Sequence, residues 1–430
     1  MDYWLPIIVL FGAFFFMLAL GVPIVYAIGL STLASISTQL DFNSALSVVS
    51  QKLASGLDSF TLLAIPFFIL SGNIMNHGGI ARRLINFARI LGGRLPGSLA
   101  HCNILANMLF GAISGSAVAS AAAMGGVMHP QQVKEGYDPA FSTAVNVASA
   151  PTGLLIPPSN TLIVYSLVSG GTSIAALFLA GYVPGILLGL AIAGIIAVRR
   201  GYPKPERPTL RQAGVAIWMA IPSIFLIILI MGGVLSGIFT PTEASAIAVI
   251  YTLFLALVLY REISVKDLPK IFLESVITTA IVLLLIGSSM GMSWAMSNAD
   301  VPFLILDLLN TISDNPIIIL LIINIILLII GTFMDMTPAV LIFTPIFLPV
   351  VTELGMDPIH FGIVMVLNMC IGICTPPVGS VLFVGCSVSK LPINKIIKPM
   401  LPFYAVMVLV LAMVTYIPQI SMALPRALGY

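Results

Sequence analysis

The same pattern of glycine and proline occurs twice in this chain, and each copy interrupts an apolar segment. The first copy covers residues 153–158 and the second covers 372–377, an offset of 219 residues. Five further pairs keep this offset: Gly72 and Gly291, Pro130 and Pro349, Gly136 and Gly355, Asp138 and Asp357, Pro139 and Pro358. The chain therefore contains an internal repeat, and the two halves are expected to share one fold.

The apolar segments indicate a membrane protein. Charged residues make up only 8% of the chain, whereas soluble domains carry about a quarter. A spanning helix needs about 20 mostly apolar residues, and the first two segments are short, so residues 4–38 alternatively form one bent helix. The predicted spans are 5–19, 22–38, 57–76, 173–198, 216–237, 241–260, 276–296 and 396–417.

Four other segments are unusual for single spans. Segments 98–128 and 317–349 are too long and carry polar residues in the middle, which predicts re-entrant hairpins with polar tips. Segments 140–168 and 359–387 contain the Gly–Pro–Pro elements. Two prolines remove amide donors from a helix, and lipid offers the freed carbonyls no partner. We therefore expect broken helices beside a polar cavity, with a structural kink as the alternative.

Charge indicates that the second half is inverted. Loop 77–97 carries four arginines, whereas its counterpart 296–316 carries three aspartates and no basic residue. With a periplasmic N-terminus, 16 of the 18 basic residues fall in cytoplasmic loops, as the positive-inside rule requires. The chain is thus predicted to be a multi-pass protein of the bacterial inner membrane, with both hairpin tips meeting near the midplane.

The fold class follows from these patterns. We predict an all-α polytopic protein of two inverted-topology repeats, with about ten transmembrane helices plus two re-entrant hairpins. Segments 77–97 and 297–316 are short and amphipathic, which indicates arm helices lying in the interface; ordinary connecting helices are the alternative. The predicted parts are a scaffold over 1–76 and 216–296, a cytoplasmic loop over 199–215, and transport parts over 98–198 and 317–420.

Inverted repeats with broken helices place substrate and coupling ions at the repeat interface. We predict two cation sites built from carbonyl and hydroxyl oxygens. Their members are Ser114, Gly115, Ser116, Ser149, Pro151 and Gly153 in the first, and Gly331, Thr332, Met334, Asp335, Gly372, Cys374 and Thr375 in the second.

Asp335 is the only acid deep inside a hairpin or broken helix. An intramembrane carboxylate is costly and is by default functional, although a helix cap at the tip is a compatible alternative. Because no chain of acids and histidines runs through these segments, sodium is favoured over protons as the coupling ion. Two or more sodium ions are expected, with no other cofactor.

Residues 139–198 contain no charged residue, so no arginine or lysine there can bind a carboxylate. An anionic substrate would rely on bound sodium, amides and hydroxyls. The candidate substrate residues, each equally consistent with packing at a tip or helix, are Ser116, Ser159, Asn160, Thr337 and Ser380.

At these same elements the chain resembles the large membrane subunit of TRAP (tripartite ATP-independent periplasmic) transporters. Stretches 63–72, 111–116, 155–159, 178–185, 348–350, 355–362 and 375–379 carry the resemblance over nearly the whole chain. One departure is Ser120, where relatives often have Thr or Asp, which leaves its role open. The resemblance implies an elevator mechanism, sodium coupling, a small four-helix membrane partner, a periplasmic substrate-binding protein and a carboxylate substrate such as a C4-dicarboxylate or sialic acid.

Other function classes receive less support. The chain has no Walker loop, no GxSxG and no HExxH, so it is not predicted to be an enzyme. No basic run suggests nucleic-acid binding. The alternatives are a stand-alone sodium/dicarboxylate-type carrier of the same architecture without a binding protein, and a channel or scaffold subunit, against which the paired hairpins argue.

Overall fold

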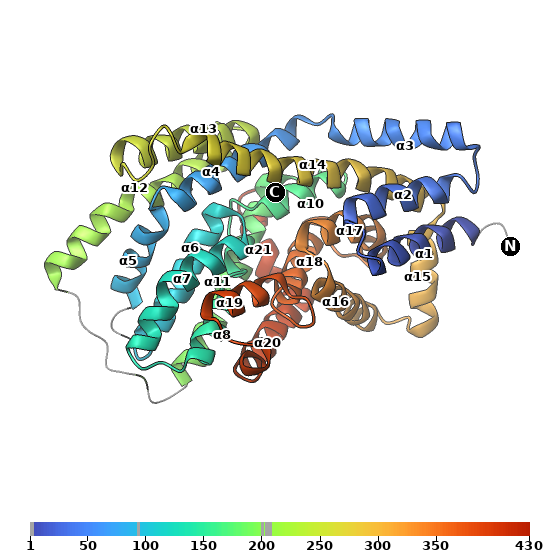
Figure 1. Ribbon diagram of the computed structural model, residues 1–430. Helices are drawn as coiled ribbons and strands as arrows, with labels where there is room; N and C mark the ends of the chain where they lie inside the picture. The colour runs from blue at the N-terminus through green and yellow to red at the C-terminus, as the bar shows by residue number, and fades with distance from the viewer. Residues whose placement is uncertain (1–3, 93–94, 199–201, 203–208) are drawn as a thin grey trace.

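The computed structural model describes residues 4–92, 95–198, 202 and 209–430. Most of the predicted loop 199–215 lies outside these residues, as does Arg94 of the first arm segment. The described residues form helices and turns with no strand, and eight helices are long and apolar enough to cross a membrane. The predicted all-α membrane fold is confirmed (Figure 1).

The first two helices form an antiparallel hairpin. Helices α1 (Leu5–Ala19) and α2 (Ile24–Ile36) are separated by Gly21, whose φ is +78°, and by Pro23. The hydroxyl of Ser35 near the end of α2 donates to the carbonyl of Pro6 near the start of α1, at 2.7 Å. The alternative of one bent helix over 4–38 is wrong, because glycine and proline reverse the chain.

The next segment corrects a sequence-based expectation. Residues 42–56, left between the predicted spans 22–38 and 57–76 with no helix assigned, form helix α3 (Phe42–Leu57). The carboxylate of Asp41 caps it by accepting from the Ser44 amide at 3.1 Å. A short 3₁₀ turn η1 (Phe60–Leu63) then leads into α4 (Ala64–His77).

In the second half the counterpart of this broken run is continuous. Helix α14 (Leu268–Asn298) starts eight residues before the predicted span 276–296. It follows α12 (Leu210–Leu235), α13 (Pro241–Leu253) and a π-helical end η2 (Phe254–Leu259). Helix α12 begins inside the predicted loop 199–215, because Thr209 and Gln212 form a capping box there.

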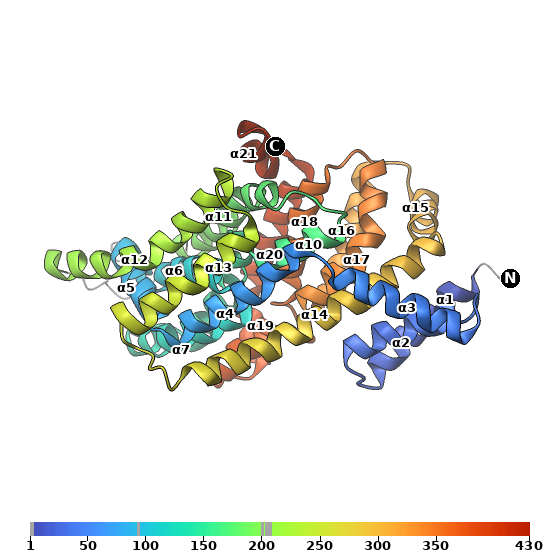
Figure 2. The same ribbon diagram turned by 90° about the horizontal axis from the view of Figure 1, so that it is seen from above.

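The remaining helices form two matching sets. The first set is α5 (Ile80–Gly92), α6 (Ser98–Ser114), α7 (Ala117–Lys134), α8 (Pro139–Ser149), α9 (Thr152–Leu155), α10 (Asn160–Val168) and α11 (Ile174–Val198). The second set is α15 (Val301–Ile312), α16 (Pro316–Phe333), α17 (Met336–Glu353), α18 (Pro358–Gly372), α19 (Ser380–Ser389), α20 (Ile393–Tyr416) and a final α21 (Gln419–Ala427). Figures 1 and 2 show α5 and α15 at opposite ends of the molecule.

Packing between the two halves of the chain is reciprocal, as an inverted repeat requires. Helix α13 packs on α4 while α2 packs on α14, and hairpin helix α7 packs on α19 while α17 packs on α10. The Cys370 thiol contacts the carbonyl of Pro151 at 3.5 Å, and these positions are equivalent, 219 residues apart. Equivalent positions touch only at the symmetry axis, so the pseudo-two-fold axis passes between the two broken helices.

Candidate functional site

The first hairpin turns at three consecutive residues. Helix α6 ends at Ser114, Gly115 takes φ +64°, and Ser116 begins α7 by accepting from the Ala119 amide at 3.2 Å. A Cβ on Gly115 would lie 2.7 Å from the Asn160 amide nitrogen. Glycine therefore permits both the left-handed turn and the close approach of α10.

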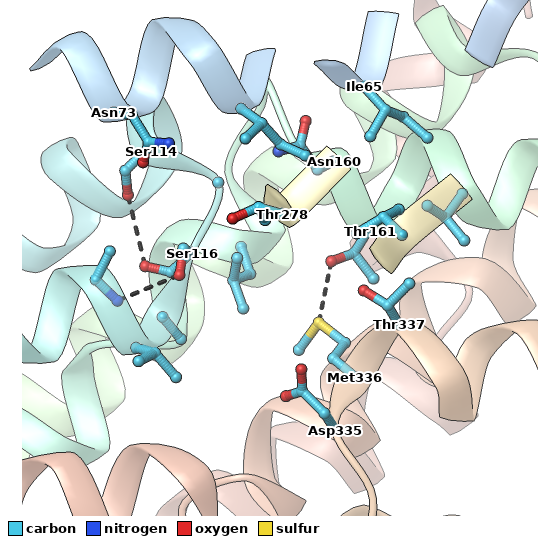
Figure 3. Close-up of a pocket in the computed structure, with 18 of the residues that line it drawn as sticks. Ile65, Asn73, Ser114, Ser116, Asn160, Thr161, Thr278, Asp335, Met336 and Thr337 are labelled. Carbon is cyan, nitrogen blue, oxygen red and sulfur yellow. Dashed lines mark hydrogen bonds between the residues drawn. The ribbon is translucent and has the colours of Figure 1, made fainter. Parts of the chain in front are cut away.

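The second hairpin turns differently. Met334 is extended, and Asp335 occupies the N-cap position of α17 without a side-chain capping bond. Its carboxylate points into the space between the tips (Figure 3). The adjacent Met336 sulfur accepts from the Thr161 hydroxyl at 3.1 Å, which ties this tip to α10 of the other half. The alternative that the Asp335 side chain caps the helix is therefore not supported by a side-chain hydrogen bond to α17.

Each hairpin touches the break of its own half through a glycine pair. A Cβ on Gly153 would lie 2.4 Å from the Gly111 Cα, and one on Gly372 would lie 2.5 Å from the Gly331 Cα. No side chain fits between backbones at these distances. Of the predicted cation ligands, the first crossing contains Gly153, and the second joins Gly331 directly to Gly372.

Backbone hydrogen bonds fix the second crossing. The carbonyl of Thr332 accepts from the amides of Val378 and Gly379, at 3.2 and 3.3 Å. The Tyr404 hydroxyl donates to the carbonyl of Cys374 at 2.6 Å, and the Thr375 hydroxyl donates to the carbonyl of Ile371 at 2.7 Å. The end of helix α16 is thus hydrogen-bonded to the break between α18 and α19.

Behind the first crossing lies a buried polar network that the sequence analysis missed. The Asn107 amide donates to the Ser149 hydroxyl at 2.7 Å and to the Asn146 side chain at 3.1 Å. The Ser120 hydroxyl donates to the Asn107 oxygen at 2.7 Å. Ser120 and the predicted ion ligand Ser149 therefore both belong to this buried network.

A cavity of about 300 Å³ lies between the two tips and the scaffold (Figure 3). One wall comes from the tips and from α10. The opposite wall comes from α4 and α14, through Asn73, Asn76 and Thr278 among others. The residues of the tips and of α10 in its lining include Ser114, Gly115, Ser116, Asn160, Thr161, Asp335, Met336 and Thr337.

Three of the five predicted substrate residues line this cavity, namely Ser116, Asn160 and Thr337. The other two lie outside its lining. Ser159 is fully buried and caps α10 by accepting from the Leu162 amide, and Ser380 begins α19. Thr161 was missed, although its neighbour Asn160 was identified.

The cavity has the chemistry of an anion site with an added acid. The first residues of α7, α10 and α17 all line it, and helix N-termini offer unpaired amides and a positive dipole end. Asp335 is the only acid in the lining, and no basic side chain of the described residues joins it. An anion here would be held by amides and hydroxyls, beside the Asp335 carboxylate.

Comparison with known proteins gives a family match over almost the whole chain. The family model described as "Tripartite ATP-independent periplasmic transporter, DctM component" matches residues 11–420. The chain is 65% identical to the uncharacterized protein YgiK of Salmonella typhimurium, covering 99% of this chain and 98% of that protein.

Two relatives have functional names. The chain is 42% identical to the C4-dicarboxylate TRAP transporter large permease protein DctM of Pseudomonas aeruginosa, over 88% of this chain and 89% of that protein. It is 38% identical to the sialic acid TRAP transporter large permease protein SiaM of Vibrio cholerae, over 95% and 96%.

Solved structures agree on the fold. The YdaH transporter of Alcanivorax borkumensis superposes with a TM-score of 0.64 over 90% of both chains, at 14% identity. The MtrF structure of Neisseria gonorrhoeae gives 0.59 over 86% of this chain and 84% of that one, at 15% identity.

Proposed function

Since this chain belongs to the family of DctM components, the large membrane subunits of tripartite ATP-independent periplasmic transporters, we propose that it imports a small organic acid together with sodium ions. Two relatives are named as transporters of C4-dicarboxylates and of sialic acid, so the proposed substrate is a carboxylate of that size class. The proposed location is the bacterial inner membrane, with a periplasmic N-terminus.

The observation that carries this proposal is the cavity between the two hairpin tips. Three helix N-termini line it, and these attract negative charge without a formal positive charge of their own. Its volume of about 300 Å³ is at the small end of ligand pockets. A compact acid suits this space better than a large or apolar molecule.

The position of Asp335 supports the proposed sodium coupling. A substrate carboxylate in this cavity lies near the Asp335 carboxylate, and two like charges about 4 Å apart repel by about 4 kcal/mol at an effective dielectric of 20. A cation bound at the tip removes this repulsion, so substrate and cation favour each other's binding. The carbonyls and hydroxyls around the two glycine crossings are the oxygen ligands that a hard cation takes.

The proposed movement is that of an elevator. The cavity lies between α4 and α14 on one side and the paired hairpins on the other, so the hairpins and broken helices can slide as one unit against the scaffold. Helices α5 and α15 connect the two parts in each half. A small four-helix membrane subunit and a periplasmic binding protein are the proposed partners.

The test is uptake in proteoliposomes holding the chain with its small membrane subunit, and with the binding protein outside. Thermal-shift screening of the binding protein against organic acids comes first. Radiolabelled succinate and sialic acid are the starting probes, and the screen decides between them. We expect uptake only with an inward sodium gradient and the binding protein. Unchanged uptake in choline at fixed voltage would refute sodium coupling, and uptake without the binding protein would favour the stand-alone carrier.

A further inference from the structure

The scaffold wall of the cavity, formed by α4 and α14, is apolar at one end and polar at the other. On α4 the lining residues are Ile65, Ile69, Asn73 and Asn76, spaced at helical intervals on one face. The two isoleucines lie toward the start of α4, and the two asparagines lie toward its end at His77. On α14 the lining residues Thr278 and Val282 follow the same order, because α14 runs in the opposite direction.

This polar character continues beyond the cavity. The Asn73 amide donates to the Ser275 hydroxyl at 2.8 Å. One turn further, His77 lies 3.8 Å from the Glu274 carboxylate. The side-chain oxygen of Asn76 is buried and has no hydrogen-bond partner among the described residues. We call these six residues the polar stripe: Asn73, Asn76, His77, Glu274, Ser275 and Thr278.

The internal repeat shows that the stripe is not a by-product of the fold. At the offset of 219, the counterparts of Asn73, Asn76 and His77 are Met292, Ala295 and Met296. All three counterparts are buried and apolar. The same helix position is therefore polar at one end of the scaffold and apolar at the other, although the backbone fold is shared.

Polar side chains at membrane depth are costly unless they face water or a partner, and they mark substrate pathways. In the predicted orientation, the end of α4 and the start of α14 lie at the cytoplasmic side, where the basic loops are. We propose that the polar stripe is the cytoplasmic exit path of the substrate, and that the amides of Asn73 and Asn76, which form the α4 wall of the cavity, bind the substrate transiently as it enters this path.

The two asparagines give the start of this path a neutral hydrogen-bonding surface. Carboxamides both donate and accept, so they suit the carboxylate and hydroxyl oxygens of a small acid as it leaves the helix N-termini. Glu274 at the far end opposes retention of an anion, which favours release. This inference rests on the proposed function for its substrate, but not for its geometry.

Thiol labelling tests the path without relying on transport. The four native cysteines are buried, so background labelling is low. Asn73→Cys, Asn76→Cys and Thr278→Cys are treated in inside-out vesicles with sulfonatoethyl methanethiosulfonate, a small impermeant anion. Ile74→Cys and Met75→Cys, at buried positions of the same part of α4, are the matched controls, and labelling of unfolded protein sets the maximum. We expect the stripe cysteines to react at least tenfold faster than the controls.

Equal rates for stripe and control cysteines, or labelling of Asn76→Cys only from the periplasmic side, would overturn the proposal. A second measurement tests the amide. Asn76→Leu should slow uptake about fivefold or more, whereas Asn76→Gln should restore the rate. Asn43→Leu, an exposed change on α3, is the control. If wild type transports no acid, the proposed function fails, while the labelling result still decides the path.

Discussion

Adding one methyl group to Gly153 should disable the first cation site. In the structure a Cβ at this position would lie 2.4 Å from the Gly111 Cα, 2.5 Å from its carbonyl carbon and 2.6 Å from the Ala112 nitrogen. Carbon atoms in contact normally lie about 3.5–4.0 Å apart. Gly153→Ala therefore requires the hairpin and the break to separate by about 1 Å.

The energetic cost can be estimated from overpacking. Extra methyl groups in a packed interior cost about 1–3 kcal/mol, and here the atoms that must move are backbone atoms on both sides. Because about 1.4 kcal/mol corresponds to a tenfold change in binding, the sodium concentration for half-maximal effect should rise about fivefold to a hundredfold. Folding of the rest of the chain should persist.

The assay is thermal unfolding of the complex in nanodiscs, with sodium chloride titrated against choline chloride at constant ionic strength. Gly126→Ala is the matched control, because its Cβ would meet nothing within 4 Å. That change should leave the sodium response intact and favour α7 slightly, since alanine is the better helix former. A wild-type sodium response in Gly153→Ala would refute the inference that this crossing shapes an ion site.

Two further changes test other parts of the mechanism. Asp335→Asn should slow sodium-dependent uptake at least tenfold while membrane insertion stays normal, because the amide cannot supply the charge that favours a cation; wild-type uptake with wild-type sodium dependence would remove Asp335 from the site. Glu262→Gln should lower thermal stability by about 1–2 kcal/mol, because Arg83 lies 3.3 Å from Glu262 and stacks over Tyr260 with its side chain only 12% exposed. Arg82→Ala, at a side chain 68% exposed, should change stability little, and an equal loss in both variants would contradict this reasoning.

The fold was predictable because the repeat leaves a sequence record. Breaks at 153–158 and 372–377 cannot lie inside ordinary spanning helices, and their shared offset requires two copies of one unit. Helix α3 was missed because it is amphipathic and resembles a polar loop by composition, although Asp41 and Ser44 form a capping pair at its start. The early start of α14 was missed because its first eight residues include the charged Lys270 and Glu274.

The candidate site was predictable only in part. Glycine, serine and proline in apolar segments predict the tips and breaks. The close approach of Gly111 to Gly153, by contrast, depends on how two helices cross. The buried network around Asn107 could have been suspected from asparagines in an apolar hairpin. The scaffold contribution of Asn73 and Asn76 could not, because the sequence does not say which face of α4 meets the hairpins.

The α1–α2 hairpin has a consequence for the surrounding lipid. Its helices hold 15 and 13 residues, which at 1.5 Å per residue gives lengths of about 22 and 20 Å. A hydrocarbon layer of about 30 Å exceeds both, so acyl chains beside this corner have to tilt or compress. Bilayers built from shorter acyl chains relieve that deformation, which makes membrane thickness itself a variable of this transporter's stability.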